Sequence, residues 1–580
     1  SSSRLEIGTR NLSVIFKQSL IFSVIGLLSC TIWSANVLAY SSLKELANGV
    51  PSYYEIDLPE SSYIEVRARR LAHARIVWVD FEVLREMGID VPPEGLTEEF
   101  EQELLEEFAN AVPGPDDPDD AFVGDEETIY YVDRYGGGGL DGNFGSGRAA
   151  SRGKFQTKGM GPMPVIGDHV DFGHRHGGAA VSEGVSEAEW GQYNHKRLPR
   201  GGNRVALLIA TGTDTVWEDG RREPRVLIVR QDPHRPAHYT PVQNSKGKLA
   251  ASDPERTRAA VERFQQAGAT KRNAKLIAYV RWIAQQYATA YAMRIYHGAT
   301  SPSNIEMSGR WIDYGTETTQ PGYGFVQTLR DNDPFGMTDE FKSWLIADPM
   351  ASFRSNTLDP QLRSSLPSDA ELFKIFDAEY EQRLRRELVS LLGVPREISE
   401  RLQDSRNARK FRILFREVAE AGAEIVDIDH HMPETVSLYS MPAILTALAE
   451  GRSIEELLPA QDLRSRFLRG YHAVMDQAMQ EARSKGIQKS AFRFYVSESG
   501  RARNRIESEF FRPSLRWENA QVAERYMETQ YRDALWDSID RMTAAADLHL
   551  DDPRPFEWVL GEKLNRITGE RYRHVFDAKG

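Results

Sequence analysis

The sequence predicts an α+β fold in which strands and helices mix through the first half and helices dominate the second. Two apolar runs, at 205–210 and 225–229, have the length and β-branched content of buried strands, and a turn signal, Asp219-Gly220, lies between them. Apolar residues recur with helical spacing over 274–296. Beyond about residue 345 helical patterns predominate, so we expect an extended helical C-terminal region.

Length, charge and cysteine content restrict the class of protein. The 580 residues leave room for about two to four ordinary domains, or for one large domain with additions. The net charge of −13 lacks the positive footprint of a general nucleic-acid binder, so no nucleic-acid partner is expected. Because Cys30 is the only cysteine, the sequence excludes a disulfide framework and a zinc–thiolate site in the folded part.

Residues 1–39 have the features of a signal peptide or a membrane anchor. Arg10 and Lys17 precede an uncharged run, and small residues suited to signal-peptidase cleavage end at Ala39. The run of about 20 uncharged residues also suits a retained membrane span, and lipid modification of Cys30 is a third alternative. We expect an exported or membrane-anchored protein rather than a cytoplasmic one, with this segment as its only membrane contact.

The next part of the chain alternates short strand-like and helical pieces. The period-two pattern at 63–67 predicts a strand, and Thr97 is placed to cap a helix with Phe100 and Phe108 on its apolar face. The Pro- and Asp-rich stretch 111–127 predicts a surface loop.

A strand-like piece at 130–135 leads into a glycine-rich stretch, 136–147. Glycines let the backbone approach phosphate oxygens and point N–H groups at them, although a plain flexible loop is the alternative. Gly137, Gly139 and Gly142 fit the dinucleotide fingerprint, but no helix pattern follows and no acidic residue is placed for a ribose, so we reject that match.

Three cationic residues stand at the ends of predicted strands. Lys158 ends a strand-like piece, and a lysine buried there needs a phosphate or carboxylate partner, with Glu187 as the nearby candidate. Arg230 ends the second buried strand and Arg235 follows it, which suits oligophosphate recognition. The alternatives are an exposed lysine and a salt-bridged surface pair of arginines.

Asn304 and Asp313 follow the long predicted helix and are separated by the apolar pair Trp311-Ile312. An amide oxygen and a carboxylate at this spacing can lie at adjacent ends of a short hairpin, where they suit a Mg²⁺ ion that also holds nucleotide phosphates. Protein kinases use the same layout of catalytic-loop Asn, short strand and Asp-x-Gly. The alternative is a polar turn followed by a buried aspartate.

The C-terminal half carries ordinary helix signals. Ser368 and Glu371 form a capping box, and Gly393 with Pro395 ends the helix that follows. The acidic and histidine residues at 427–431 lack a paired histidine spacing, so we interpret them as a loop rather than a metal site.

The motifs together resemble the selenoprotein O family, a pseudokinase-fold family that transfers AMP to proteins. The resemblance is carried by 58–63 with Val66 and Arg67, by 145–149, by 157–162, by Glu187, by Arg230 and 235–239, and by His297-Gly298, Asn304 and 312–315, and it continues more weakly to 513–516.

The resemblance implies a protein-kinase-like two-lobed fold with an extended helical C-terminal region. The implied units are an N-terminal extension packed on the N-lobe (40–128), an N-lobe with the nucleotide loop (129–245), a C-lobe with the metal motif (246–345), and the helical region (346–580).

The same resemblance implies an ATP site bound in reverse orientation. Lys158, Arg230 and Arg235 would hold the terminal phosphates, while Glu187 pairs with Lys158. Asn304 and Asp313 would hold Mg²⁺, with Mn²⁺ as an alternative. The residues implied to line the pocket are Gly145, Gly147, Arg148, His176 and Gly177.

In the implied reaction, a Ser, Thr or Tyr hydroxyl of an unknown protein substrate attacks the α-phosphate, and pyrophosphate leaves. The site would accelerate this step by positioning the groups and neutralising charge. A monomer is expected.

The sequence departs from the family at residues that matter for catalysis. The family's general base, an aspartate, is replaced by Ser303, which is a poor base at neutral pH, and Glu306 substitutes for it only if the loop folds differently. Position 176 is His where Asp is usual, and the family's C-terminal Cys or selenocysteine pair is absent. Three hypotheses stay open: a protein adenylyltransferase, a catalytically impaired nucleotide-binding scaffold, and an exported binding protein or effector on the same fold.

Overall fold

The computed structural model describes residues 42–547 apart from short gaps. The gaps are 115–116, 119, 137–141, 168–169, 171, 243–247, 324, 328–331, 335–338, 422, 426–434, 438 and 530–531. The predicted signal peptide or anchor (1–39), the stretch 427–431 and the last part of the predicted helical region (548–580) therefore lie outside the described residues.

In the described part of the chain, eight strands form one antiparallel sheet in the order β2-β7-β8-β6-β5-β4-β1-β3. The strands are β1 (Tyr63–Leu71), β2 (Arg75–Val79), β3 (Asn110–Ala111), β4 (Phe122–Asp133), β5 (Ala149–Arg152), β6 (Phe155–Lys158), β7 (Val205–Val216) and β8 (Arg222–Gln231). The two buried strands predicted at 205–210 and 225–229 are confirmed as β7 and β8, which pair with each other.

The N-terminal strands belong to the same sheet as the central ones, because β1 pairs with β4 and β2 pairs with β7. The surface loop predicted at 111–127 is wrong over its last part. Residues from Phe122 onward pair with β1, where Glu127 lies opposite Arg69 and the two side chains can face solvent together.

Both faces of the sheet are covered by helices. One face packs against α2 (Leu43–Ala47), α3 (Phe81–Glu86) and α4 (Glu98–Phe108), and the other against α6 (Val181–Arg197). Strand residues alternate between the two layers: Leu227 faces the first and Ile228 the second. The cap predicted at Thr97 is confirmed, since its hydroxyl accepts from the Phe100 N–H at 3.2 Å.

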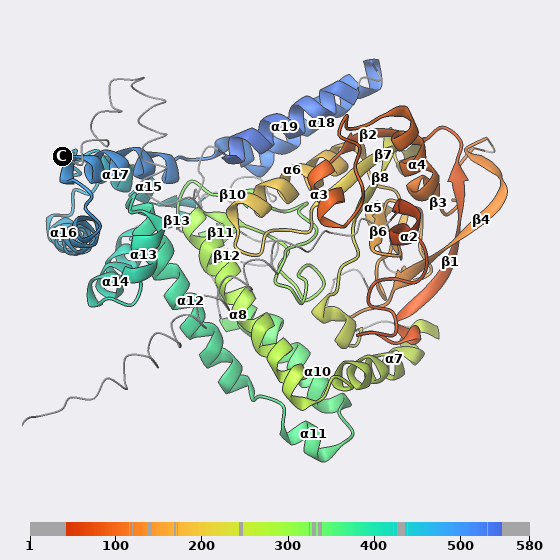
Figure 1. Cartoon of the computed structure of the whole chain (residues 1–580), viewed down its shortest axis with the longest axis horizontal. Helices are drawn as coiled ribbons and strands as arrows, with labels where there is room; N and C mark the ends of the chain where they lie inside the picture. The colour runs from red at the N-terminus through yellow and green to blue at the C-terminus, as the bar shows by residue number, and fades with distance from the viewer. Residues whose placement is uncertain are drawn as a thin grey trace, which may run out of the picture.

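The long helix α8 (Ala269–Met293) leads from the sheet toward the helical region and packs along α12 (Asp369–Leu391) (Figure 1). Its predicted stripe is core, with Leu276 fully buried. The predicted bounds of 274–296 are shifted. The helix starts after Gly268 and ends where Arg294 takes a left-handed conformation with φ of 59°.

The remaining elements before α12 are short, apart from one long helix. They are η1 (Glu60–Ser62), α5 (Phe172–Arg175), η2 (Pro236–Tyr239), α7 (Lys248–Gln265), β9 (Ile295–Tyr296), β10 (Thr318–Thr319), β11 (Phe325–Gln327), β12 (Asn332–Pro334), α9 (Asp339–Lys342), the π-helical turn η3 (Ser343–Ala347), α10 (Asp348–Asn356) and α11 (Pro360–Ser364).

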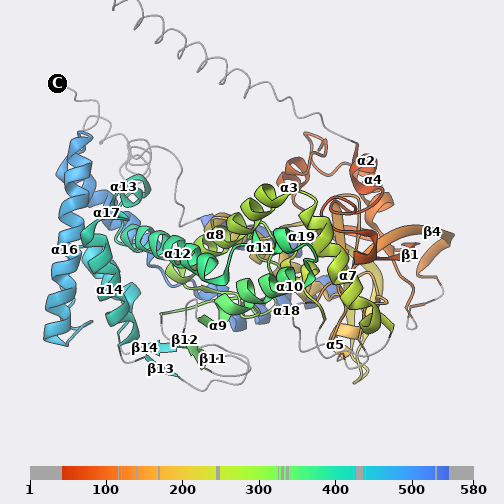
Figure 2. The same cartoon turned by 90° about the horizontal axis from the view of Figure 1, so that it is seen from below.

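The helical region shares a core of its own with the end of α8 and stands at the opposite end of the molecule from the sheet (Figure 2). The capping box predicted at Ser368 and Glu371 is confirmed at the start of α12. The further elements are α13 (Arg396–Leu402), α14 (Arg406–Glu420), β13 (Ala423–Ile425), β14 (Thr435–Ser437), α15 (Met441–Ala449), α16 (Gln461–Ser484), α17 (Lys489–Arg503) and η4 (Ser508–Phe510).

The chain then returns to the sheet through α18 (Arg512–Thr529) and α19 (Arg532–Asp547), which cover α6 (Figure 1). The protein is thus a mixed α/β structure with an antiparallel sheet and a helical C-terminal region, as the sequence predicts at that level. None of the described helices combines the length and apolar character that crossing a bilayer requires.

A buried carboxyl joins α6 to both returning helices. Glu189 accepts hydrogen bonds from the Asn519 amide at 3.0 Å and from the Ser538 hydroxyl at 3.1 Å. Burial raises the pKa of Glu189 to about 8, against these two hydrogen bonds. The folded state therefore binds this proton more tightly than the unfolded chain does.

We expect Glu189→Gln to stabilise the protein in a pH-dependent way. The free energy of unfolding of the wild type falls as pH rises from about 4.5 to about 8, because Glu189 must ionise while buried. The variant removes that contribution, so it should be roughly 4 kcal/mol more stable than the wild type at pH 8 and nearly equal to it near pH 4.5. Urea or thermal unfolding at both pH values measures this. Glu127→Gln, on the exposed face of β4, is the control, and an equal difference at both pH values contradicts the assignment.

Candidate functional site

Seven charged side chains from several elements meet where the sheet faces α6. We call this group the Lys158 cluster; its members are Arg148, Lys158, Glu183, Glu187, Arg230, Arg235 and Asp313. All but Glu183 were predicted as site residues from the sequence. The structure brings them together although they span 166 positions, from Arg148 to Asp313, counted inclusively in the chain.

The strand register explains how Lys158 and Arg230 reach the same place. Gln156 of β6 lies directly opposite Arg230 of β8, and Lys158 is two residues further along the same face of β6. The Arg230 guanidinium donates to the Gln156 side-chain oxygen at 3.1 and 3.2 Å. Both cations therefore point from the sheet toward α6.

Lys158 is the centre of the cluster. Its Nζ lies 2.7 Å from a Glu187 oxygen, 2.9 Å from a Glu183 oxygen and 3.1 Å from Asp313 Oδ1. The lysine side chain is only 7% exposed, so these carboxylates replace the water it would otherwise bind. The predicted pair of Lys158 and Glu187 is in direct contact.

Arg230 near the end of β8 and Arg235 just after it approach the same aspartate. The Arg230 guanidinium lies 3.6 Å from Asp313 Oδ1 and 3.4 Å from Glu187, and that of Arg235 lies 3.7 Å from Asp313 Oδ2. Arg235 also donates to the carbonyl of Ser303 and lies 5.0 Å from the ring centroid of Tyr135. The arginines are thus held between the sheet and the loop that carries Asp313.

Glu183 is the member that sequence reasoning missed. It lies one turn before Glu187 on α6, and its carboxylate takes a bidentate contact from Arg148 at 2.7 and 2.9 Å. The spacing of four residues places both glutamates on the same face of a helix, and that spacing is the signal that would have found it.

The charges of the cluster are mutually reinforcing. Burial alone would raise the pKa of the Asp313 carboxyl, but Lys158, Arg230 and Arg235 hold it well below its usual range. In the same way Arg148 and Lys158 overcome the effect of burial and lower the pKa of Glu183 to about 2. Burial opposes the charged form of Lys158, yet Asp313, Glu183 and Glu187 raise its pKa. These groups are therefore ionised at neutral pH.

Within this described group, four cationic side chains face three carboxylates, which leaves one positive charge. A surplus positive charge in a partly enclosed position favours an additional anion. Asp313 is 31% exposed, so the cluster is reachable from solvent at that residue.

Asn304 and Asp313 lie at the ends of a short hairpin-like loop. The Ile312 N–H donates to the Asn304 carbonyl at 3.1 Å, and Ile305 and Trp311 form an isolated antiparallel β-bridge. The side-chain Nδ2–H group of Asn304 donates a hydrogen bond to the Ala299 carbonyl at 2.8 Å, so the side-chain oxygen points away from that carbonyl.

The backbone at Asp313 is left-handed, with φ of 62°. This conformation is uncommon for a residue with a side chain, although Asp tolerates it better than most, and it recurs at functional sites. His297 supports the turn: its Nδ1 accepts from the Ala299 N–H, so Nε2 carries the proton that is donated to the Ile312 carbonyl at 3.0 Å. Burial lowers the pKa of His297 to about 4, which keeps the ring neutral.

The residues suit a divalent ion only in combination with a ligand. Among the described residues, no three His, Cys, Asp or Glu side chains gather as a metal site. Asn304 and Asp313 offer one amide oxygen and one carboxylate, and Mg²⁺ commonly takes its other ligands from phosphates and water. A metal held by these two side chains would therefore need phosphate or water oxygens as its other ligands.

The loop around Ser303 holds no free carboxylate of its own. The Ser303 hydroxyl lies 2.8 Å from that of Ser301. Glu306 does not take the place of the missing base, because it is buried and bonded to Arg310 at 2.7 Å and to Ser308 at 2.8 Å. The alternative loop conformation that would make Glu306 a base is not the one observed.

The predicted glycines are needed by the packing around Arg148. A Cβ on Gly145 would lie 1.9 Å from the Asp133 carbonyl oxygen, and one on Gly177 would lie 2.0 Å from the backbone of Gly161. Gly147 is less tightly enclosed. These approaches fix the two turns that flank Arg148.

His176 is next to the cluster rather than within it. Its Nδ1 accepts from the Gly178 N–H at 3.0 Å, while the Gly178 carbonyl accepts from Arg148 at 3.0 Å. Burial and the nearby Arg148 lower the pKa of His176 to about 4. The ring is therefore neutral at pH 7 and adds no positive charge that would attract an entering anion.

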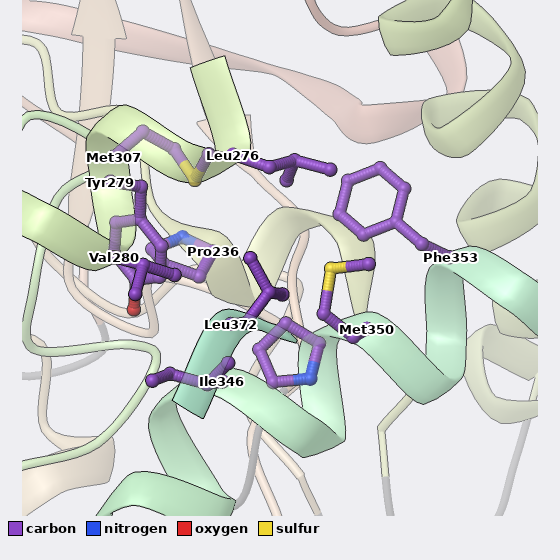
Figure 3. Close-up of a pocket in the computed structure, with 10 residues that line it drawn as sticks. Pro236, Leu276, Tyr279, Val280, Met307, Ile346, Met350, Phe353 and Leu372 are labelled. Atoms are coloured by element: carbon purple, nitrogen blue, oxygen red, sulfur yellow. The ribbon is translucent and has the colours of Figure 1, made fainter. Parts of the chain in front are cut away.

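A separate apolar cavity lies between α8, η3 and α10 (Figure 3). Its volume is about 10 Å³, and its lining includes Pro236, Tyr279 and Phe353. That volume is at the limit for one water molecule, so the cavity is a packing gap and not a nucleotide site.

The chain matches no protein-family model and no curated protein. The function is therefore argued from the geometry of the Lys158 cluster.

We expect Lys158→Met to destabilise the protein strongly, because it removes the ammonium group that contacts the Glu183, Glu187 and Asp313 carboxylates directly in a buried position. Breaking such a group costs about 3 kcal/mol or more. Lys154→Met, an exposed position in the same β5–β6 hairpin, is the control and should change stability little. Urea unfolding compares the two, and equal losses contradict the central role of Lys158.

Proposed function

We propose that this chain binds the triphosphate of ATP with Mg²⁺ or Mn²⁺ at the Lys158 cluster and transfers AMP to protein hydroxyl groups. The observation that carries the proposal is the contact of Lys158 with both Glu187 and Asp313, with Arg230 and Arg235 against the same aspartate. These are the residues that the resemblance to the selenoprotein O family assigns to phosphate and metal.

The proposal includes a two-lobed, kinase-like arrangement. The antiparallel sheet with α6 would be the N-lobe, and α7, α8 and the Asn304–Asp313 loop would belong to the C-lobe. The Lys158 cluster then lies where the two units meet, because Lys158 comes from the sheet and Asp313 from the loop. A site between two lobes is where a nucleotide is enclosed on both sides.

In the proposed reaction, a substrate hydroxyl oxygen forms a bond to the α-phosphorus while the bond from that phosphorus to the β-bridging oxygen breaks. Pyrophosphate leaves and the hydroxyl proton passes to solvent. Lys158, Arg230 and Arg235 bind the leaving phosphates and neutralise their charge. Asn304 and Asp313 would hold the metal ion, which would supply polarisation of the phosphoryl oxygens. Positioning and charge neutralisation carry this chemistry, and no covalent enzyme intermediate is needed.

A nucleotide-binding scaffold with impaired catalysis is the second candidate, and Ser303 favours it. Serine at this position accepts no proton at neutral pH, and Glu306 is engaged by Arg310. Binding without transfer is the outcome that distinguishes the scaffold from the enzyme.

ATP labelled at the α or the γ phosphate tests the enzyme. Incubation with Mg²⁺ and candidate protein substrates is expected to place α label, and no γ label, in protein. Asp313→Asn keeps the shape and tolerates the left-handed backbone, and it should lower transfer about 100-fold or more through loss of the metal ligand. Asp125→Asn, at an exposed position on β4, is the control. Label from the γ position alone excludes AMP transfer, whereas thermal stabilisation by ATP without any label supports the scaffold.

Restoring a carboxylate at position 303 tests the missing base. We expect Ser303→Asp to raise the transfer rate by about tenfold or more, with a rate that increases as the new carboxyl ionises. Ser303→Asn has a similar shape without a base and should not raise the rate. Equal rates for the two variants mean that proton removal does not limit the reaction.

A further inference from the structure

The Glu183 carboxylate contacts two of the cations that line the proposed phosphate site, at the place where an anion would bind. Its two carboxylate oxygens accept hydrogen bonds from the two Nη groups of Arg148, and one of these oxygens lies 2.9 Å from Lys158 Nζ. Arginine binds carboxylate and phosphate with the same two-pronged geometry. The position that Glu183 fills is therefore also a position for a phosphate group.

We infer that Glu183 is an intramolecular competitor of the ligand's phosphate and limits the affinity of the Lys158 cluster for oligophosphates. This inference rests on the proposed function, because it concerns how a triphosphate enters the same site. A triphosphate that contacts Arg148 and Lys158 must displace the Glu183 carboxylate or share these cations with it. In either case the negative charge of Glu183 opposes the negative charge of the ligand.

Glu183 is better suited to this role than the other two carboxylates. The Glu187 side chain is 3% exposed and is shared by Lys158 and Arg230, so its removal takes a carboxylate contact from two buried cations at once. Asp313 is a proposed metal ligand. Glu183 is 26% exposed, and it lies in the first turn of α6, from which its side chain can turn toward solvent.

Arg148 remains in place when Glu183 moves, because it has a second anchor. Its guanidinium also donates to the Gly178 carbonyl at 3.0 Å. That carbonyl belongs to the turn that the close approach of Gly177 to Gly161 fixes. A structural role for Glu183 as the only support of Arg148 is therefore not required by these contacts.

Titration with inorganic triphosphate separates competition from support. The full chain is titrated calorimetrically, with and without Mg²⁺, as the wild type, Glu183→Gln and Glu183→Ala. If Glu183 competes with phosphate, both variants bind triphosphate about tenfold more tightly than the wild type. Glu183→Asp retains the charge and should bind close to the wild-type affinity. Glu127→Gln changes the net charge equally at a remote exposed pair with Arg67 and is the control.

The outcomes distinguish the inference from the proposal beneath it. Tighter binding by the folded Gln or Ala variant supports competition, and either variant alone is sufficient if the other fails to fold. If the wild type binds triphosphate and both neutral variants bind it equally or more weakly, the inference is overturned while the nucleotide proposal stands. If neither the wild type nor the variants bind triphosphate, both are overturned. The same gain in Glu127→Gln also overturns the inference, because it assigns the effect to net charge alone.

Discussion

The structure depends on the neutralisation of one buried lysine. An ammonium group in the protein interior without a partner is too costly to keep charged. Lys158 is held charged by Glu183, Glu187 and Asp313, which come from a helix and a distant loop. The lysine is neutralised only when the sheet, α6 and the Asp313 turn lie together. The charge balance therefore depends on the tertiary arrangement.

The helix α6 connects the charged cluster to the C-terminal helices. Two of its glutamates face the sheet cations, while Glu189 faces α18 and α19. The position of the carboxylates in the cluster therefore depends on helices that are more than 300 residues away in the sequence. Aromatic contacts support the same junction, because Trp190 of α6 lies 5.4 Å from Phe510 between ring centroids. Packing of the C-terminal helices thus helps to set the geometry of the site.

The sequence predicts features that depend on short-range patterns, and features for which only a few residue types are chemically possible. The strands β7 and β8, the caps at Thr97 and Ser368, and the apolar stripe of α8 depend on short-range patterns. The pairing of Lys158 with a glutamate follows because a buried lysine has few possible partners. The end of α8 was misplaced because Arg294, rather than a glycine, takes the left-handed position. Neither Glu183 nor Glu189 was predicted as a site residue; the tertiary fold shows that Arg148 and Lys158 bind Glu183 and that Glu189 is buried.

The charge network also explains which chemistry the site favours. Each carboxylate whose pKa is lowered by the cations, Glu183 and Asp313, holds its proton too weakly to act as a base near neutral pH. The only other nearby acid of the loop, Glu306, is bound by Arg310. A site of this kind suits the proposed binding of oligophosphates better than it suits the removal of protons. Phosphoryl and nucleotidyl transfer depend mainly on positioning and on charge stabilisation. A serine at position 303, where the resembled family has an aspartate, therefore lowers the expected rate without removing what the proposed reaction requires most.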